Sequence, residues 1–215
     1  MIIAIDGSAA SGKGTLARGL AAYLGFDYLD TGALYRAIAL SLLNAGADIN
    51  YINEKQAVKE AALLDLELTQ SPEIRNDRIA SLASKVAALG PVRAELLKLQ
   101  RTFALTPPQG GGAVLDGRDI GTIVLPNADL KFFIDADIDI RAERRTKELL
   151  QSGQSVMFSD VLTEMKARDE RDRIRSVAPL KASDNAITID TSSMDEAEVL
   201  ALALSHVDSA FSPKQ

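Results

Sequence analysis

The sequence contains no cysteine and only one histidine, His206. The lack of cysteine excludes disulfide bonds, thiol nucleophiles and zinc fingers, and a single histidine excludes every site that needs two. We expect His206, which lies near the C-terminus, to be an ordinary surface or helix residue. Any catalysis therefore has to use carboxylates, lysine, arginine, hydroxyl groups and the backbone.

Long apolar segments are also missing. The longest run without charge, residues 102–115, contains two prolines and three glycines and is shorter than the about 20 apolar residues that span a bilayer. The N-terminus has no basic region and only a short apolar run before Asp6, so we expect no signal peptide. These absences predict a protein of the reducing cytoplasm that does not bind membranes.

The composition is that of a folded globular protein. The chain has 215 residues, 47% hydrophobic and 25% charged, which suffices for one well-buried domain with an insertion. The net charge of −6 argues against nucleic-acid binding by the surface as a whole. Residues 141–175 nevertheless carry 9 basic and 7 acidic side chains, or +2, whereas the remainder carries 15 and 23, or −8. We expect a local cationic site in this segment.

Short apolar runs alternate with segments of helical periodicity. We predict strands at residues 2–5, 26–29, 113–115, 130–134 and 186–189, and helices at 14–24 and 33–45. Each predicted strand ends in a polar cluster. The pattern indicates an α/β fold, with a parallel five-stranded sheet, helices on both faces, and ligands at the carboxyl ends of the strands.

Two segments depart from this alternation. Residues 48–106 show amphipathic helical patterns and one stretch of strand character at 64–69, so we predict an insertion that is mainly helical. Residues 209–215 have the composition of a fraying tail.

A glycine-rich loop joins the first predicted strand to the first predicted helix. Its residues are Gly7, Ser8, Ala9, Ala10, Ser11, Gly12, Lys13, Gly14 and Thr15. Glycines let consecutive backbone N–H groups point at one anion, and the helix N-terminus adds about half a positive charge there. We predict that the loop binds a polyphosphate, with Lys13 between the β- and γ-phosphates and the Thr15 hydroxyl at phosphate or magnesium. The strict pattern has Ser or Thr directly after the lysine, and the intervening Gly14 gives the GKGT form of nucleoside monophosphate kinases.

Arginines recur where an anionic acceptor could be held. Arg36 follows the second predicted strand, Arg93 follows a Gly-Pro pair, and Arg118 stands beside Asp119 after the third predicted strand. The planar guanidinium donates two parallel hydrogen bonds, which suits phosphate. Arg93, taken alone, could equally be a solvated surface residue. The case for Arg118 and Asp119 is stronger, because Gly117 and the apolar strand before it place both at the ligand edge of the sheet.

A later segment places several charges on one helical face. A helical wheel brings four residues within about 100° of one another: Arg168, Arg171, Asp172 and Arg175. The simpler interpretation is a set of surface salt bridges, each worth a few tenths of a kcal/mol. Three guanidiniums so close together would repel unless an anion offset them, and a transferred phosphoryl group is such an anion.

Upstream of that face, a further basic helix is expected to close over a nucleotide. Arg141, Arg144 and Arg145 lie on it, and Gly153 with a polar turn follows. We predict a lid at about residues 144–160. Phosphoryl transfer needs in-line positioning, cationic stabilisation and exclusion of water, so a protein without cysteine could perform it.

Four stretches together resemble bacterial cytidylate kinases, a family of the nucleoside monophosphate kinase group with the P-loop fold. They are residues 5–15, 29–36 (LDTGALYR), 115–122 (LDGRDIGT) and 168–180 (RDERDR to APL). They run through the whole chain in family order, and the last three are specific to the family. The resemblance implies a single P-loop NTPase-type kinase domain over residues 1–215, with a monophosphate-binding insert at about 48–106 and the lid at about 144–160.

The resemblance also implies an activity, the transfer of the γ-phosphoryl group of ATP to CMP or dCMP. Magnesium would be held mainly by nucleotide phosphates and water, with Thr15 as the candidate protein ligand. We expect a monomer whose partners are these small nucleotides. Longer members carry a β-hairpin before the Glu73-Ile74-Arg75 stretch, so the insert is trimmed here.

Individual contacts are implied as well. Thr31, Arg93 and Asp119 would read the cytosine edge, with Arg175 near the base; Ser84, Arg168 and Asp172 would contact the sugar; Arg36 and Arg118 would hold the acceptor phosphate. Arg144 would contact ATP together with the glycine-rich loop. The transferred group would be stabilised by Lys13, Arg118, Arg168 and Arg175. The sugar-side and phosphate-side duties of the arginines could be exchanged.

Three alternatives follow from the residues alone. A P-loop kinase of another small metabolite would need the loop but not the arginine-carboxylate face with Asp119. A nucleotide-dependent switch that reads guanine should show an Asn-Lys-x-Asp motif, which this sequence lacks. RNA binding by residues 141–175 would require interleaved aromatics, and only Phe158 occurs there.

Overall fold

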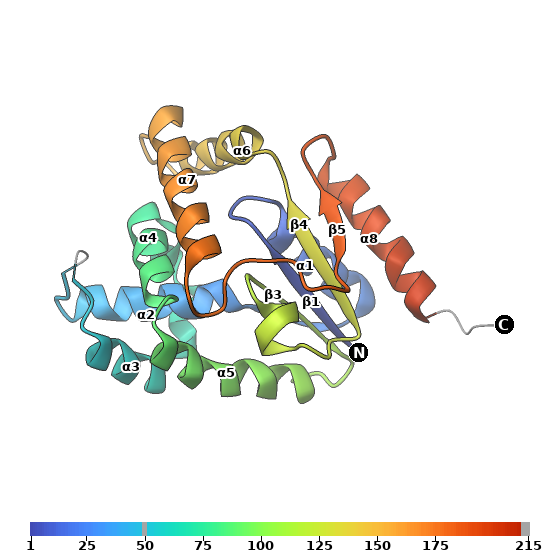
Figure 1. The fold of residues 1–215 in the computed structure, drawn as a ribbon, viewed down its shortest axis with the longest axis horizontal. Coiled ribbons are helices and arrows are strands. Elements are labelled where there is room, and N and C mark those ends of the chain that lie inside the picture. Colours follow the sequence, from blue (N-terminus) through green and yellow to red (C-terminus); the bar gives the residue numbers. More distant parts are fainter. Residues whose placement is uncertain (49–50, 212–215) are drawn as a thin grey trace.

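One parallel sheet organises the molecule. The computed structural model describes residues 1–48 and 51–211. Within these ranges five parallel strands lie in the order β2-β3-β1-β4-β5 (Figure 1). Their bounds are Ile2–Gly7 (β1), Asp27–Asp30 (β2), Ala113–Gly117 (β3), Leu130–Asp135 (β4) and Ile187–Asp190 (β5). The five predicted strands and their parallel arrangement are confirmed.

Both faces of the sheet are covered, as the sequence predicts. Ile3 and Ile5 point to one face and Ala4 to the other, because successive side chains of a strand alternate. The covering elements are α1 (Lys13–Leu24) and α8 (Glu196–Phe211) on the first face, and α5 (Gly90–Leu105) and the π-helical turn η3 (Ile120–Val124) on the second.

A second apolar core lies beside the sheet, on the left of Figure 1. Leu34, Ile38, Leu82 and Leu96 are almost fully buried in it. Together with α5 it is built from α2 (Thr31–Asn44), α3 (Glu54–Ala62), η1 (Leu66–Gln70), η2 (Pro72–Arg75) and α4 (Asp77–Val86).

The strand expected at 64–69 is wrong, because the 3-10 turn η1 occupies this stretch. The Asp65 side chain accepts a hydrogen bond of 2.9 Å from the backbone N–H of Glu67 and so caps the turn. Leu64 and Leu68 pack against the second core. Within the described part of the chain, no strand pairs with this segment. Leu64 and Leu68 therefore pack against helices, whereas Leu66 between them is exposed.

Two helices lie above the carboxyl ends of the strands (Figure 1). They are α6 (Ile138–Gln151) and α7 (Phe158–Ile174). Ala142 and Leu149 of α6 meet Val161 and Met165 of α7, and Ala9 of the glycine-rich loop joins this cluster. The basic segment identified in the sequence is thus a helical pair packed against the loop.

Strand β5 and helix α8 form the C-terminal end of the described chain. Strand β5 is an edge strand in which Ile189 is buried but Thr188 and Asp190 are exposed, since nothing pairs with its outer side among the described residues. Helix α8 includes Ser209 and Ala210, so the tail begins later than expected, and residues 212–215 lie outside the described part.

His206 belongs to α8, as the sequence predicts, and its ring meets Phe132 edge-on, with ring centroids 6.4 Å apart. None of the described helices combines the length and apolar character needed to cross a bilayer.

Candidate functional site

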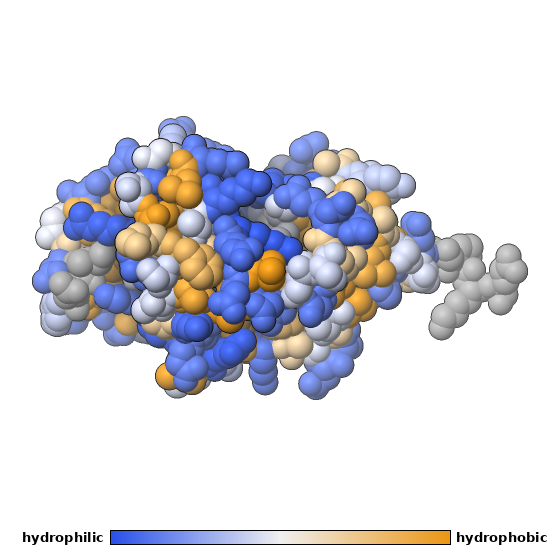
Figure 2. All heavy atoms as spheres, turned by 90° about the horizontal axis from the view of Figure 1, so that it is seen from above, coloured by the Kyte–Doolittle hydropathy of each residue, from blue (hydrophilic) through white to orange (hydrophobic). Residues whose placement is uncertain are grey.

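A polar cavity opens at the carboxyl ends of the strands. Its volume of about 810 Å³ lies within the usual range for small-molecule sites, roughly 300–1,000 Å³. Figure 2 shows hydrophilic residues gathered around the hollow on the side of α6 and α7. Most residues singled out in the sequence line it: Ala10, Ser11, Gly12, Lys13, Gly14, Thr15, Thr31, Arg36, Ser84, Arg93, Arg118, Asp119, Arg144, Arg168, Asp172 and Arg175.

Three residues of the glycine-rich loop lie deeper. Ala9 lines an adjoining cavity of about 490 Å³, while Gly7 and Ser8 line neither cavity. The Ser8 hydroxyl donates to the carboxylate of Asp135 at 2.5 Å, which ties the loop to the end of β4. A side chain at Gly7 is excluded, because its Cβ would lie 2.0 Å from the backbone oxygen of Ile134.

The loop ends in a turn that starts α1. Gly12 is the N-cap, with a φ of 88° that favours glycine. Lys13 follows, and its ammonium donates to the Ser8 carbonyl at 3.3 Å. Burial, together with the positive Arg118, lowers the pKa of Lys13 to about 7. The negative charge of a bound polyphosphate would raise this pKa again and so favour the protonated amine.

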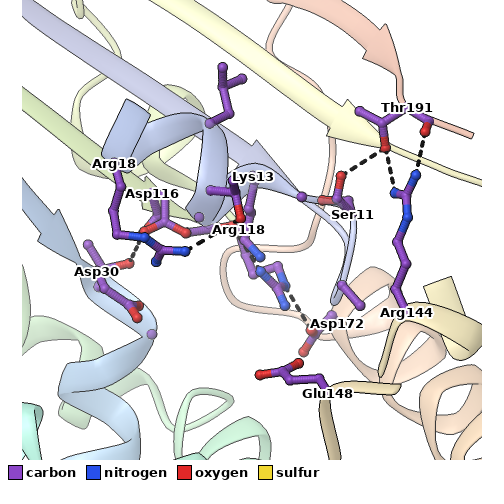
Figure 3. A pocket seen from close by; sticks show the side chains of 18 of the residues that line it. Ser11, Lys13, Arg18, Asp30, Asp116, Arg118, Arg144, Glu148, Asp172 and Thr191 are labelled. Carbon is purple, nitrogen blue, oxygen red and sulfur yellow. Dashed lines mark hydrogen bonds and ion pairs between the residues drawn. The ribbon is translucent and has the colours of Figure 1, made fainter. Parts of the chain in front are cut away.

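Asp116 is a site residue that the predictions missed. It lies at the end of β3, in register with Asp30 at the end of β2, and it accepts a hydrogen bond of 2.8 Å from the Tyr28 hydroxyl. Burial and the neighbouring Asp30 raise its pKa. Figure 3 shows it beside Lys13 and Arg118. An apolar strand ending in aspartate next to the phosphate loop was the available signal, because P-loop enzymes hold magnesium with such a carboxylate.

Asp119 is a buried carboxylate of the cavity that lies between two arginines. It is 4% exposed, and it forms an ion pair with Arg93 on α5. Arg175, at the end of α7, approaches its other oxygen at 3.8 Å. The guanidinium of Arg93 also lies over the ring of Tyr35, 5.6 Å from its centroid. The structure thus brings together Arg93, Asp119 and Arg175 from three distant parts of the sequence.

Asp172 gathers a second group of cations. The Arg118 Nε donates to it at 3.2 Å, and Arg168 and Arg175 each lie 4.0 Å away. Burial alone would raise the pKa of Asp172, but these guanidiniums hold it below its ordinary value. The Ser84 hydroxyl donates to the same carboxylate at 3.2 Å, so α4 is tied to α7.

Two guanidiniums of this group keep donors free. Arg168 Nε and Arg175 Nη2 are buried without a hydrogen-bond partner in the described chain. Burial, with Arg118 beside it, lowers the pKa of Arg168 to about 10. Buried donors without partners are costly unless a ligand satisfies them, so an anion fits this position.

The second predicted strand and helix supply two further residues. Arg36 pairs with Asp30 at 2.7 Å and faces both cavities. Thr31 is buried, and its hydroxyl donates to the Asp116 carbonyl at 2.7 Å.

The three arginines expected on one lid helix have different surroundings. Arg144 donates to Thr191 at 2.9 and 2.6 Å, and the Thr191 hydroxyl donates to the Ser11 carbonyl of the loop (Figure 3). Arg141 does not line the cavity: it is 3% exposed and pairs with Asp169 of α7 at 2.7 Å. Arg141 lies on the basic helix as expected, and its charge joins α6 to α7, while a hydrogen bond of 3.3 Å to the Ala9 carbonyl connects it to the glycine-rich loop.

Two further arginines line the adjoining cavity, and no individual nucleotide contact was expected for either. Arg145 pairs with Asp77 on α4 at 2.5 Å, and Arg171 has a buried Nε without a hydrogen-bond partner among the described residues. Both line this cavity with Lys13. The helical wheel placed Arg171 on the cationic face, which was the signal available for it.

Known proteins resemble this chain in sequence over nearly its whole length. A sequence model of the family described as cytidylate kinase matches residues 3–209. The chain belongs to the cytidylate kinase family. A cytidylate kinase of Paramagnetospirillum magneticum is 51% identical over 209 residues, covering 97% of this chain and 98% of the relative. One of Rhodospirillum rubrum is 50% identical over 205 residues, covering 95% of each.

Solved structures support the fold independently of close sequence similarity. A protein of Thermus thermophilus aligns over 99% of this chain and 98% of its own length, with a TM-score of 0.51 and 19% identity. An uncharacterised protein of Eubacterium ventriosum covers 97% of this chain and 99% of its own, with a TM-score of 0.56 and 17% identity. At these identities the likeness concerns the fold alone.

Proposed function

We propose that the protein transfers the γ-phosphoryl group of ATP to CMP or dCMP, forming ADP and CDP or dCDP. The observation that carries this proposal is the buried Asp119 carboxylate, which shares one cavity with the phosphate loop. A carboxylate only accepts hydrogen bonds, so it suits the exocyclic amine of cytosine and opposes the carbonyl that uracil has there. Membership of the cytidylate kinase family supports the same substrate.

The acceptor nucleotide lies along the groups already described. Asp119, Arg93 and Thr31 face the base, with Arg175 next to them. Ser84, Arg168 and Asp172 face the sugar, and Arg36 and Arg118 hold the monophosphate. These positions are supported by the shared cavity and by the ion pairs that link Asp119 and Asp172 to the arginines.

The donor nucleotide lies on the opposite side of the cavity. Backbone N–H groups of the loop and Lys13 bind its phosphates, and Arg144 borders the same space. In-line transfer then needs cations around the migrating phosphoryl group, which Lys13, Arg118 and Arg168 supply with little movement. Arg175 adds a free buried donor.

Magnesium, as the partner of ATP, fits the donor set at this end of the sheet. The Thr15 hydroxyl and the Asp116 carboxylate both line the cavity near Lys13, and oxygen ligands suit a hard cation. Within the described residues, no group of three histidine, cysteine, aspartate or glutamate side chains is arranged to hold a metal ion. The ion would therefore be held mainly by phosphates and water, where it would neutralise charge that develops on the phosphates.

Two segments would close the site. Residues 144–160 connect α6 to α7 above the loop, and residues 48–106 carry the helices that hold Ser84 and Arg93. Closure of both would exclude water from the transferred group. We further expect a monomer that acts in the cytoplasm.

A coupled assay of ADP formation tests the proposal. Purified protein is given ATP with each of CMP, UMP, AMP and GMP, and with their deoxy forms. CMP or dCMP should react much faster than the others. Equal rates with CMP, UMP and AMP would refute the cytosine assignment, and ATP binding without transfer to any monophosphate would indicate a binding module instead.

A further inference from the structure

One buried carboxylate of the sheet is not used by the reaction. Asp6 is the last residue but one of β1, next to the glycine-rich loop, and it is 4% exposed. Its two oxygens accept hydrogen bonds from the backbone N–H groups of Ile120 and Gly121, both at 2.7 Å. It therefore connects the strand that carries the phosphate loop to η3, the turn that follows the acceptor-reading Asp119.

These two N–H groups begin η3, and Asp119 is the residue that caps it. An aspartate in that position ordinarily accepts from the N–H groups that follow it. Within the described chain the Asp119 side chain makes no such bond, and its carboxylate lies between Arg93 and Arg175. Asp6, on the neighbouring strand β1, accepts these N–H groups in place of Asp119.

We propose that Asp6 is a positioning residue for substrate selection: by accepting the N–H groups of Ile120 and Gly121, it leaves the Asp119 carboxylate free to face the base of the acceptor. The inference rests on the proposed role of Asp119. Without Asp6, two buried N–H groups lose their partner, which is costly. The Asp119 side chain is adjacent to them in sequence and can turn back to satisfy them.

The local packing supports a dedicated contact. A Cβ on Gly121 would lie 3.4 Å from the nearer Asp6 oxygen and 3.1 Å from the Lys131 side chain, so glycine lets the backbone approach closely. Burial raises the pKa of Asp6 to about 7 even though both N–H groups oppose this rise. Burying a carboxyl group at this depth is costly, and here its two oxygens accept the two backbone N–H groups.

The test compares selectivity, which general destabilisation does not change. For Asp6→Ala and Asp6→Asn, kcat/KM is measured with CMP and with UMP at saturating ATP, alongside thermal unfolding. The CMP-to-UMP ratio should fall by roughly tenfold or more in Asp6→Ala, the worth of one hydrogen bond to a charged group. Asp6→Asn keeps one acceptor oxygen, so its CMP-to-UMP ratio should lie between those of Asp6→Ala and the wild type.

Asp27→Ala is the matched control. Asp27 is also a buried carboxylate and accepts from the backbone N–H of Gln109 at 2.8 Å, but it lies at the start of β2, at the other end of the sheet. Asp27→Ala should unfold at a lower temperature and keep the wild-type CMP-to-UMP ratio of kcat/KM.

Asp119→Asn separates the two proposals. If it leaves the ratio unchanged, the base-reading role of Asp119 is wrong. If Asp119→Asn lowers the ratio while both Asp6 variants keep it, the positioning role of Asp6 is overturned. Should Asp6→Ala fail to fold, the ratio of Asp6→Asn decides in the same way.

Discussion

The most direct test of the acceptor site is Asp119→Asn. The substitution keeps the shape of the side chain but replaces a group that only accepts hydrogen bonds with an amide that can also donate. Turned one way, the amide donates to the uracil carbonyl; turned the other way, it accepts from the cytosine amine. The preference for cytosine should therefore collapse through two changes, a weaker contact to CMP and a new contact to UMP.

The structure indicates the size of the effect. Asp119 is 4% exposed, so the proposed hydrogen bond between its carboxylate and the base would be shielded from water. A hydrogen bond to a charged group is worth about 1.5–3 kcal/mol, which corresponds to a loss of roughly 10- to 150-fold in the CMP-to-UMP ratio. The variant also removes the counter-charge of Arg93 and Arg175, and breaking a buried ion pair costs about 3–5 kcal/mol of stability.

The assay is kcat/KM for CMP and UMP by ADP formation, at a temperature where circular dichroism shows both proteins folded. Asp172→Asn is the control, because it removes a carboxylate from the same arginine cluster on the sugar side. Asp172→Asn should lower kcat/KM for CMP and for UMP by the same factor. An unchanged ratio in Asp119→Asn, or an equal fall of the ratio in both variants, would refute the assignment of Asp119 to the base.

Three other outcomes are expected. Lys13→Ala and Arg118→Ala should lower kcat by orders of magnitude while circular dichroism stays native, since they remove charge from the transferred group; near-normal turnover would exclude that role. Because burial and Arg118 lower the pKa of Lys13 to about 7, its amine is largely neutral at about pH 8 and should take up a proton when phosphates raise that pKa again. Calorimetry in buffers of different ionisation enthalpy should show this uptake at about pH 8 and little at about pH 6, with none assigned to the site in Lys13→Ala. Closure of residues 48–106 and 144–160 should contract the scattering profile when a bisubstrate analogue binds, and superimposable profiles would contradict it.

The sequence predicted the sheet well because buried parallel strands are short apolar runs that end in polar residues. It failed at 64–69, where Leu64 and Leu68 pack against helices, Leu66 is exposed, and a 3-10 turn replaces the expected strand. The same alternation of leucines occurs in strands and in such turns. Among the described residues, the two cases differ in that no strand pairs with residues 64–69.

The candidate site was predictable as far as residue type and strand position determine it. Lys13 and Asp119 follow strands and line the cavity as expected. Arg141 and Arg144 are three residues apart on α6, yet one is buried against Asp169 and the other borders the cavity. Sequence shows the charge of an arginine but not the carboxylate that α7 brings to it.

The carboxylates explain how an acidic chain builds a cationic site. Asp172 holds Arg118 at 3.2 Å and two further guanidiniums at 4.0 Å, which limits their mutual repulsion before any nucleotide binds. One carboxylate cannot satisfy three guanidiniums, so free donors remain on Arg168 and Arg175. The arginines are thus already in place, and under the proposed function phosphate oxygens would complete their hydrogen bonds. Charge that develops during transfer would then meet oriented donors, which is the arrangement that lowers a barrier with little reorganisation.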